Sequence, residues 1–260
     1  SMYKPLLIAL SFLWRIPITP IQTTEKDFQK ALPLFPLVGA LEGFLISLIG
    51  YFLAPLILPE FLAIVILLIL FYMRGIFHLD GLSDTFDALS YHGGVDSEEA
   101  KAIRLKIMKD STIGVAGVTA IVINLLAKYA LIKEILLYNP LSLIWVFFLS
   151  RGFLLWCIFY SIPAKPEGLG YLMKKNLTKK GFLLGNTFCV LLTCLLLLSP
   201  FKVSLLAFFF LIFLNFFVLF YFKSKFEKAF GGLTGDNLGA LIEISELITL
   251  FYLGVIWPKL

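Results

Sequence analysis

Charged residues are scarce in this chain of 260 residues: 15% are Asp, Glu, Lys or Arg, against about 25% in soluble domains. Hydrophobic residues make up 60% of the chain, whereas soluble domains have about 45–50%. A chain with so little polar surface cannot face water on all sides. This composition excludes a soluble enzyme, a disordered chain and a secreted disulfide scaffold.

Histidine and cysteine are also scarce. The two histidines, His78 and His92, are too few for a histidine-rich metal site, and the three cysteines lie inside apolar runs without metal-ligand spacing. No internal repeat and no shift in composition marks a second unit. We therefore expect residues 1–260 to form a single membrane-embedded domain.

Long apolar runs are what the sequence does contain, and each is about as long as the 20 residues that cross a bilayer as a helix. They predict an all-α fold, a polytopic membrane bundle of about seven transmembrane helices. A shorter apolar stretch, Leu6–Ile16, ends at Pro17 and Pro20 and is predicted to lie at the membrane interface. The predicted spans are Leu34–Leu58, Phe61–Phe77, Ile113–Leu136, Leu141–Ile162, Phe182–Leu198, Val203–Phe222 and Leu238–Trp257.

The connecting segments differ sharply in charge. Ser1–Pro33, His78–Thr112, Pro163–Gly181 and Lys223–Asn237 contain 16 of the 22 lysines and arginines, and the alternate segments contain only Lys202 and Lys259. By the positive-inside rule the first set is cytoplasmic. Because the polar and glycine-rich motifs lie in the same set, we expect an active site on the cytoplasmic side of the cell's inner membrane. The net charge of +5 then reflects topology, not nucleic-acid binding.

The run HLDGLSDTFDAL contains three aspartates, Asp80, Asp84 and Asp87. On a helix continuing from the preceding span they fall within about 60° of one another. Like charges on one helical face repel, so a positive partner is expected. A divalent cation held by carboxylate oxygens is the simplest candidate, and a solvated acidic surface is the alternative.

Two further polar segments precede apolar runs. In RLKIMKDSTIGVAGV, Asp110 follows the cations Arg104, Lys106 and Lys109. These cations could bind phosphates or anchor the loop to anionic lipid. Asp110 could cap the next helix. The sequence GGLTGDNLGA supplies Gly231, Gly232, Gly235 and Asp236, residue types that bind phosphates at helix N-termini.

Ionisable residues also occur within the apolar runs. Glu243 and Glu246 lie in the last run, and Arg151 and Lys128 are their candidate partners. Such residues are either functional or form a buried structural ion pair. His78 could bind a substrate phosphate, orient an aspartate or be structural.

Together these motifs resemble the adenosylcobinamide-GDP ribazoletransferase family, also called cobalamin synthases. The resemblance extends in order over most of the chain, through FLWRIPI, FPLVG, HLDGLSDTFDAL, RLKIMKDSTIGVAGV, AKPEGLG and GGLTGDNLGA. The sequence departs from the family pattern at Lys165 and at Glu42, and we assign Glu42 no role.

The resemblance implies that α-ribazole, or its 5′-phosphate, attacks adenosylcobinamide-GDP and displaces GMP, with Mg²⁺ as cofactor. Asp80, Asp84 and Asp236 would hold Mg²⁺, and Asp87 or Asp110 would accept the hydroxyl proton. The expected phosphate-binding set is His78, Arg104, Lys106, Lys109, Gly231, Gly232 and Gly235, with Arg151, Glu167, Glu243 and Glu246 in support. The expected partners are these substrates and membrane lipid, with no nucleic acid; a homo-oligomer or an association with other cobalamin-assembly enzymes is an open alternative.

Two other functions compete. A CDP-alcohol phosphotransferase also carries an acidic array with an Asp-Gly step, but here the expected Ala-Arg pair is missing and an extra aspartate is present. A transporter would distribute charges through the depth of its spans, whereas most of these lie toward one face.

Overall fold

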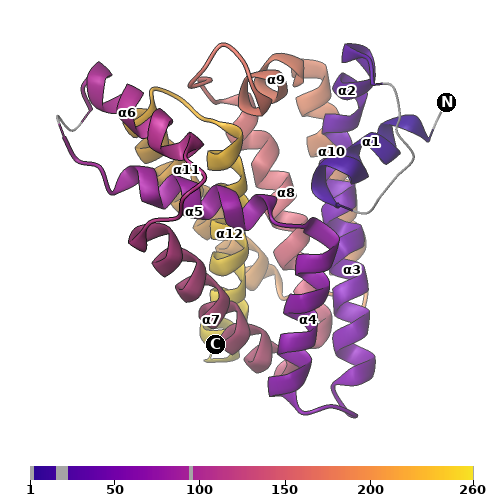
Figure 1. Ribbon diagram of the computed structural model, residues 1–260. Helices are drawn as coiled ribbons and strands as arrows, with labels where there is room; N and C mark the ends of the chain where they lie inside the picture. Colours follow the sequence, from indigo (N-terminus) through magenta and orange to yellow (C-terminus); the bar gives the residue numbers. More distant parts are fainter. Residues whose placement is uncertain (1–2, 16–22, 94–95, 260) are drawn as a thin grey trace.

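The protein is entirely helical in the part of the chain that the computed structural model describes, residues 3–15, 23–93 and 96–259 (Figure 1). These ranges contain no strand, only an isolated bridge between Pro163 and Leu233, so the predicted all-α class is confirmed. The α-helices are α1 (Lys4–Leu13), α2 (Glu25–Ala31), α3 (Phe35–Leu53), α4 (Pro59–Arg74), α5 (Phe77–Leu89), α6 (Glu98–Lys109), α7 (Val115–Tyr138), α8 (Ile144–Phe159), α9 (Leu169–Asn176), α10 (Lys179–Leu197), α11 (Leu205–Phe230) and α12 (Gly235–Phe251).

Within the described ranges, six helical segments are long and apolar enough to cross a membrane. They are the continuous run of α2 and α3, α7, α8 with the short turn before it, α10, α11, and α12 with its extension to Ile256. Counting the bent pair α4 and α5 as one span gives the predicted seven. The chain is an integral membrane protein with the expected helical bundle.

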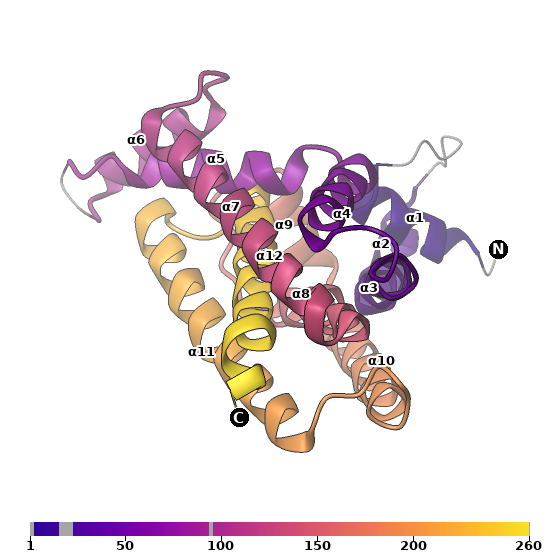
Figure 2. The same cartoon turned by 90° about the horizontal axis from the view of Figure 1, so that it is seen from below.

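Helices α8 and α12 form the centre of the bundle, because most of their residues are buried, whereas α7, α10 and α11 direct most of theirs outward (Figure 2). Helix α3 packs closely on α8 through glycines. A Cβ at Gly39 would lie 2.4 Å from the Phe147 carbonyl oxygen, and one at Gly43 would lie 2.7 Å from that of Ile144. Small residues allow helices to approach this closely in a membrane. Close packing of α3 on α8 therefore stabilises the centre of the bundle, where the hydrophobic effect does not drive helices together.

The helix that carries the three aspartates does not continue the preceding span, and that prediction was wrong. Helix α5 turns 90° from α4 and crosses the bundle (Figure 1). Gly75 separates the two helices at φ +66°, a conformation that glycine adopts at little cost. The backbone N–H of Arg15 donates to the Met73 carbonyl oxygen at 2.5 Å, so the segment after α1 fixes the corner. The aspartates therefore lie on a transverse helix outside the continuous spans.

The N-terminal apolar stretch forms α1, which is shorter than a span and packs against α2 and α3. Ile16, Pro17 and Pro20, with which that stretch was predicted to end, lie outside the described residues. Helices α2, α6 and α9 lie at one end of the bundle and the C-terminus at the other (Figure 1). The predicted basic segments thus lie at one end of the molecule.

Candidate active site

The crossing of α5 over the start of α12 brings Asp84 and Asp236 together. At the crossing, a Cβ on Gly81 would lie 2.5 Å from the Asp236 carbonyl oxygen, so only glycine permits this approach. One turn later, the Asn237 side chain donates to the Thr85 hydroxyl at 3.1 Å. The carboxyl groups of Asp84 and Asp236 are within hydrogen-bonding reach of each other. Two residues 152 positions apart in the sequence thus form the centre of the acidic cluster, which we define as Asp80, Asp84 and Asp236.

The acidic cluster carries more negative charge than its surroundings neutralise. Partial burial, followed by the negative charges of Asp236, Asp80 and Asp87, raises the pKa of Asp84 to about 7. Burial and like charges close together both favour the protonated form of a carboxyl. A bound cation would remove that repulsion.

The acidic cluster has donor chemistry that fits Mg²⁺. In the described ranges no three His, Cys, Asp or Glu side chains already converge on one metal position. Mg²⁺ usually takes only one or two carboxylates and completes its shell with water and substrate phosphates, so a three-ligand protein cage is not required. Asp84 and Asp236 supply such a carboxylate pair.

Asp87 is bonded to the start of α7. Its carboxylate accepts hydrogen bonds from the backbone N–H groups of Gly114 at 2.8 Å and Gly117 at 2.6 Å. The first N–H groups of a helix lack partners inside the helix and favour a negative charge. Asp87 therefore fastens α5 to α7, and its predicted role as a proton acceptor stays a prediction.

Asp110 lies in the exposed loop between α6 and α7. Its carboxylate accepts hydrogen bonds from the backbone N–H and the hydroxyl of Thr112, and these bonds lower the pKa of Asp110. The N-cap of α7 is Gly114, so the alternative that Asp110 caps this helix is wrong. Its predicted catalytic role stays a prediction.

The predicted phosphate-binding cations of α6 differ in their surroundings. Arg104 is buried and donates to the carbonyl oxygens of Tyr91 at 3.0 Å and Ala229 at 2.9 Å. Its guanidinium therefore joins the segment after α5 to the end of α11. Lys106 and Lys109 are exposed to solvent, where either a phosphate or a lipid headgroup can reach them.

The glycine-rich loop before α12 packs on the loop between α8 and α9. Gly232, at φ +149°, would place a Cβ 2.4 Å from the Ile162 carbonyl oxygen. The backbone N–H of Leu233 donates to that oxygen at 2.6 Å, and the N–H of Ala164 donates to the Leu233 carbonyl at 3.0 Å. Gly232 thus serves close backbone packing. Gly231 ends α11 in the left-handed conformation, and Glu167 is exposed on the α8–α9 loop.

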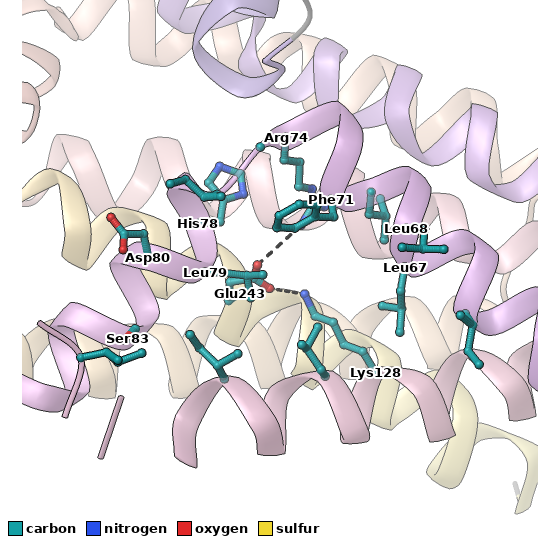
Figure 3. A pocket seen from close by; sticks show the side chains of 17 residues that line it. Leu67, Leu68, Phe71, Arg74, His78, Leu79, Asp80, Ser83, Lys128 and Glu243 are labelled. Carbon is teal, nitrogen blue, oxygen red and sulfur yellow. Dashed lines mark hydrogen bonds and ion pairs between the residues drawn. The ribbon is translucent and has the colours of Figure 1, made fainter. Parts of the chain in front are cut away.

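Two cavities meet at His78 on α5. The first cavity, of about 580 Å³, lies between α4, α5 and α7 and is lined by Asp80 and by many apolar side chains (Figure 3). The second cavity, of about 480 Å³, is bordered by α1, α5, α9 and α12, and Arg15, Lys165, Gly235 and Asp236 line it. His78 lines both. The acidic cluster therefore borders one cavity through Asp80 and the other through Asp236.

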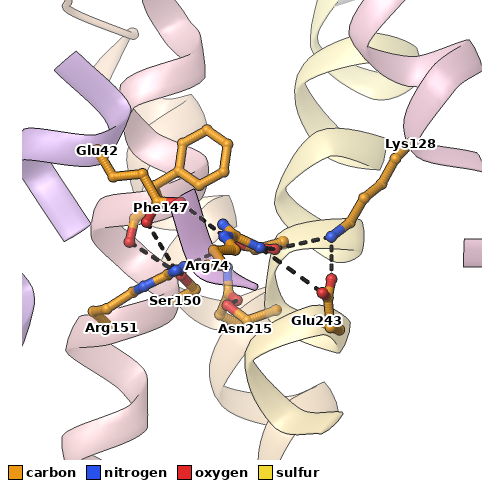
Figure 4. Close-up of polar contacts among 10 residues, drawn as sticks. Glu42, Arg74, Lys128, Phe147, Ser150, Arg151, Asn215 and Glu243 are labelled. Atoms are coloured by element: carbon orange, nitrogen blue, oxygen red, sulfur yellow. Dashed lines mark hydrogen bonds and ion pairs between the residues drawn. The ribbon is translucent and has the colours of Figure 1, made fainter. Parts of the chain in front are cut away.

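A buried ionic network joins α3, α4, α7, α8 and α12 (Figure 4). Arg151 pairs with Glu42 at 2.9 Å and Glu246 at 2.6 Å, and Arg74 donates to each of these carboxylates at 2.7 Å. Lys128 pairs with Glu243 and lies 2.9 Å from Glu246. Three cations thus match three carboxylates, as buried charges require. The network consists of Glu42, Arg74, Lys128, Arg151, Glu243 and Glu246.

Comparison with known proteins assigns the family. The model of a family described as cobalamin-5-phosphate synthase matches residues 5–254. The chain belongs to the cobalamin-5-phosphate synthase family. Curated relatives named adenosylcobinamide-GDP ribazoletransferase include those of Thermodesulfovibrio yellowstonii, 38% identical with 97% of each chain covered, and Desulfitobacterium hafniense, 36% identical with 96% of each covered. That of Clostridioides difficile is 33% identical, with 96% of each chain covered. No solved structure matches the chain.

Membership of this family confirms the resemblance that the sequence motifs indicated and makes the chain a transferase. It also decides among the three functions left open, because the match covers nearly the whole chain. The predicted partners of Glu243 and Glu246, namely Arg151 and Lys128, are confirmed by the ion pairs.

The sequence analysis did not name Arg74, and it assigned no role to Glu42, which pairs with Arg74 and Arg151 in the network. Arg74 lies at the end of an apolar run, where arginine is ordinarily taken as a marker of the membrane boundary. The available signal was the number of acidic residues in the spans: Glu42, Glu243 and Glu246 exceed Lys128 and Arg151 by one. Neutralising the three buried carboxylates requires a third buried cation in addition to Lys128 and Arg151.

Proposed function

We propose that this transferase joins adenosylcobinamide-GDP to α-ribazole, or to α-ribazole 5′-phosphate, with release of GMP. A hydroxyl oxygen of the ribazole forms a bond to the phosphorus on the cobinamide side. The bond from that phosphorus to the GMP oxygen breaks, and the hydroxyl proton passes to a base. The observation that carries the proposal is the position of the acidic cluster between two cavities.

Asp84 and Asp236 are the proposed pair of Mg²⁺ ligands, and Asp80, the third predicted ligand, belongs to the same acidic cluster without converging with them on one metal position. When bound there, Mg²⁺ would neutralise charge on the pyrophosphate during its displacement. The raised pKa of Asp84 supports this assignment, because it reflects burial of the carboxyl and, after that, the negative charges of Asp236, Asp80 and Asp87 around it. Lys165 and Arg15 line the second cavity together with Asp236, and we propose that these cations bind phosphate oxygens that this carboxylate would otherwise repel.

Asp87 is the better placed of the two predicted proton acceptors. It follows Asp84 by three residues on α5, whereas Asp110 is an exposed loop residue bonded to Thr112. The two backbone N–H groups that bind Asp87 hold its carboxylate in position. Correct placement of the base is the first requirement for general base catalysis.

The basic end of the bundle is proposed to face the cytoplasm, which would place the acidic cluster on the cytoplasmic side of the inner membrane. Helices α2, α6 and α9 lie at that end (Figure 1). Labelling of single cysteines at α6 and at the C-terminal end in intact cells would test this orientation.

The proposed metal site is tested by Asp84→Asn in purified protein. We expect this variant to remain folded in detergent, because the amide is close in size to the carboxyl, and to lose Mg²⁺-dependent GMP release. Wild-type turnover by Asp84→Asn would refute the metal site.

A further inference from the structure

The second cavity contains two cations that come from segments far apart in the sequence. Its volume of about 480 Å³ falls in the range of roughly 300–1,000 Å³ that is typical of small-molecule sites. Arg15 follows α1, Lys165 lies in the α8–α9 loop, and both line the cavity together with Asp236. Among the described residues, no carboxylate forms an ion pair with Arg15 or Lys165. Both cations are therefore available to a negatively charged ligand.

The Arg15 side chain is held at the start of α5. Its guanidinium lies 4.0 Å from the centre of the Phe77 ring, and a cation over an aromatic face is a favourable contact. A Cβ on Gly75 would lie 2.6 Å from the Arg15 Cγ atom, so glycine at that position leaves room for the side chain. Phe77 and Asp84 share one face of α5, about 10 Å apart along its axis. The guanidinium thus lies to the N-terminal side of Asp84.

Lys165 lies near the second carboxylate of the proposed metal-binding pair. Its positive charge acts on Asp236, and both residues line the second cavity. Asp236 meets α5 at Gly81, where the two backbones are in close contact. One cation of the cavity is therefore associated with the start of α5 and the other with the start of α12.

The proposed base lies on the other side of Asp84. Asp87 follows Asp84 toward the C-terminal end of α5, is bonded to the start of α7 and does not line the second cavity. Along α5 the order is Arg15 on Phe77, then Asp84, then Asp87. In a phosphoryl transfer the attacking and leaving oxygens lie roughly in line on opposite sides of the phosphorus. This order provides cations on one side of the reacting group and a base on the other.

We infer that Arg15 and Lys165 bind the phosphate of GMP in the second cavity, so that GMP leaves toward the start of α5 and α-ribazole attacks from the side of Asp87. This inference rests on the proposed function and adds to it the direction of the reaction. As the ribazole hydroxyl oxygen bonds to phosphorus, its proton passes to Asp87, and the electron pair of the breaking bond stays on the GMP oxygen. The GMP phosphate thereby gains a negative charge, and cations placed where charge develops stabilise the transition state.

Two other ligands can bring a phosphate to these cations. One is α-ribazole 5′-phosphate, but its ribose separates the 5′-phosphate from the attacked phosphorus, and the charge of that phosphate does not change in the reaction. The GMP phosphorus is joined to the attacked phosphorus through a single oxygen, so it must lie beside the metal-binding pair, as Lys165 does. The other ligand is a phospholipid headgroup, which takes no part in the reaction. The experiment separates the three sources of phosphate.

The experiment is equilibrium dialysis of GMP against the purified, detergent-solubilised chain with Mg²⁺ present, which requires no turnover. Arg15→Gln and Lys165→Gln each remove one cation from the cavity. Lys180→Gln is the matched control, because Lys180 is exposed and lines neither cavity. We expect the Kd for GMP to rise at least tenfold in each cavity variant and to change less than twofold in the control.

A second pair of variants keeps every charge and provides a test if Arg15→Gln misfolds. Leu169→Trp narrows the second cavity from α9, whereas Leu172, on the same helix, does not line it. The two leucines are 40% and 45% exposed, so a general effect of tryptophan on folding would appear at both positions. We expect the Kd for GMP to rise at least tenfold in Leu169→Trp and to change less than twofold in Leu172→Trp.

Competition identifies the source of the phosphate. Saturating α-ribazole 5′-phosphate should change the Kd for GMP less than twofold, because the two ligands bind on different sides of Asp84. A Kd for GMP that rises in proportion to the concentration of α-ribazole 5′-phosphate would overturn the inference. So would a wild-type chain that does not bind GMP, or cavity variants with unchanged Kd. Loss of a copurifying phospholipid from Arg15→Gln and Lys165→Gln with unchanged Kd for GMP would assign the cations to a lipid headgroup instead.

Turnover separates this inference from the proposed function. In variants that turn over, the KM for adenosylcobinamide-GDP should rise while that for α-ribazole stays constant. Binding of GMP by a wild-type chain that forms no ribazole-containing corrinoid, with the expected loss in the cavity variants, would refute the proposed function and leave the cavity assignment standing. Formation of that corrinoid by the wild type, with normal GMP binding in all three cavity variants, would overturn the assignment and leave the proposed function standing.

Discussion

The affinity of the acidic cluster for a divalent cation should depend on pH through Asp84. The carboxyl of Asp84 has a pKa of about 7 because it is partly buried and faces the negative charges of Asp236, Asp80 and Asp87. A metal binds the ionised carboxylate, and its binding releases the proton. Affinity should therefore rise as pH increases toward 7 and level off above it.

The magnitude follows from one protonation. Each pH unit below the pKa lowers the ionised fraction about tenfold, so the apparent Kd at pH 6 should be about tenfold weaker than at pH 8. Mn²⁺ is a suitable probe, because it also prefers carboxylate and water oxygens and its free concentration is measured by electron paramagnetic resonance. The titration is run on the detergent-solubilised chain at pH 6, 7 and 8.

Two variants complete this prediction. Asp84→Asn removes the titrating group and should abolish the pH dependence between 6 and 8 along with most of the affinity. Asp96→Asn removes an exposed carboxylate of the α5–α6 segment and should leave both unchanged. A wild-type Kd that is constant from pH 6 to 8 would refute the charge argument.

Three other substitutions test the surrounding structure. Arg74→Met leaves three buried carboxylates with only two cations, Lys128 and Arg151, and should lower the free energy of unfolding by about 3–5 kcal/mol, measured by thermal denaturation in detergent. Gly81→Ala forces α5 away from the Asp236 carbonyl, so GMP release should fall at least tenfold while the fold persists. Asp87→Asn should lower kcat by about 10²-fold or more, whereas Asp110→Asn should lower it less than about twofold, because Asp110 is exposed.

Each of these predictions has a control and a contradicting result. Lys133→Met breaks a partly exposed pair with Glu60 and should cost at most about 1 kcal/mol; an equal loss in both variants would contradict the account of the network. At Gly152 a Cβ would meet only the Cys189 sulfur, at 3.3 Å, so Gly152→Ala should retain activity. Full activity of Gly81→Ala, or a larger loss in Asp110→Asn than in Asp87→Asn, would refute the assigned positions.

Composition and periodicity predict the fold well here, because an apolar run of spanning length has few alternatives to a membrane helix. The α4–α5 corner could not be predicted in the same way. A run from Phe61 to Phe77 and the residues after it is also compatible with one straight helix. The bend depends on Gly75, on contacts from Arg15 and on the buried pairing of Arg74, which are tertiary and distant in sequence.

The candidate site was predictable as a set of residues but not as an arrangement. Motif spacing selected Asp84 and Asp236, and their proximity depends on the crossing at Gly81. The hydrogen bonds that Asp87 accepts from the backbone N–H groups of Gly114 and Gly117 link α5 to the start of α7. No local sequence pattern predicts such contacts between helices. The hydrogen bond from buried Arg104 to the Ala229 carbonyl oxygen is likewise a long-range contact. The cluster of cations in the sequence did not predict which of them would be buried.

The central claim is that this chain transfers the cobinamide phosphate from GMP to α-ribazole. The most direct measurement is incubation of wild-type protein in liposomes with adenosylcobinamide-GDP, α-ribazole and Mg²⁺, followed by chromatography of the corrinoid and nucleotide products. We predict one GMP and one ribazole-containing corrinoid for each adenosylcobinamide-GDP consumed, both absent when Asp84→Asn replaces the wild type. Unchanged substrate, or GMP released without a ribazole-containing corrinoid, would contradict the claim.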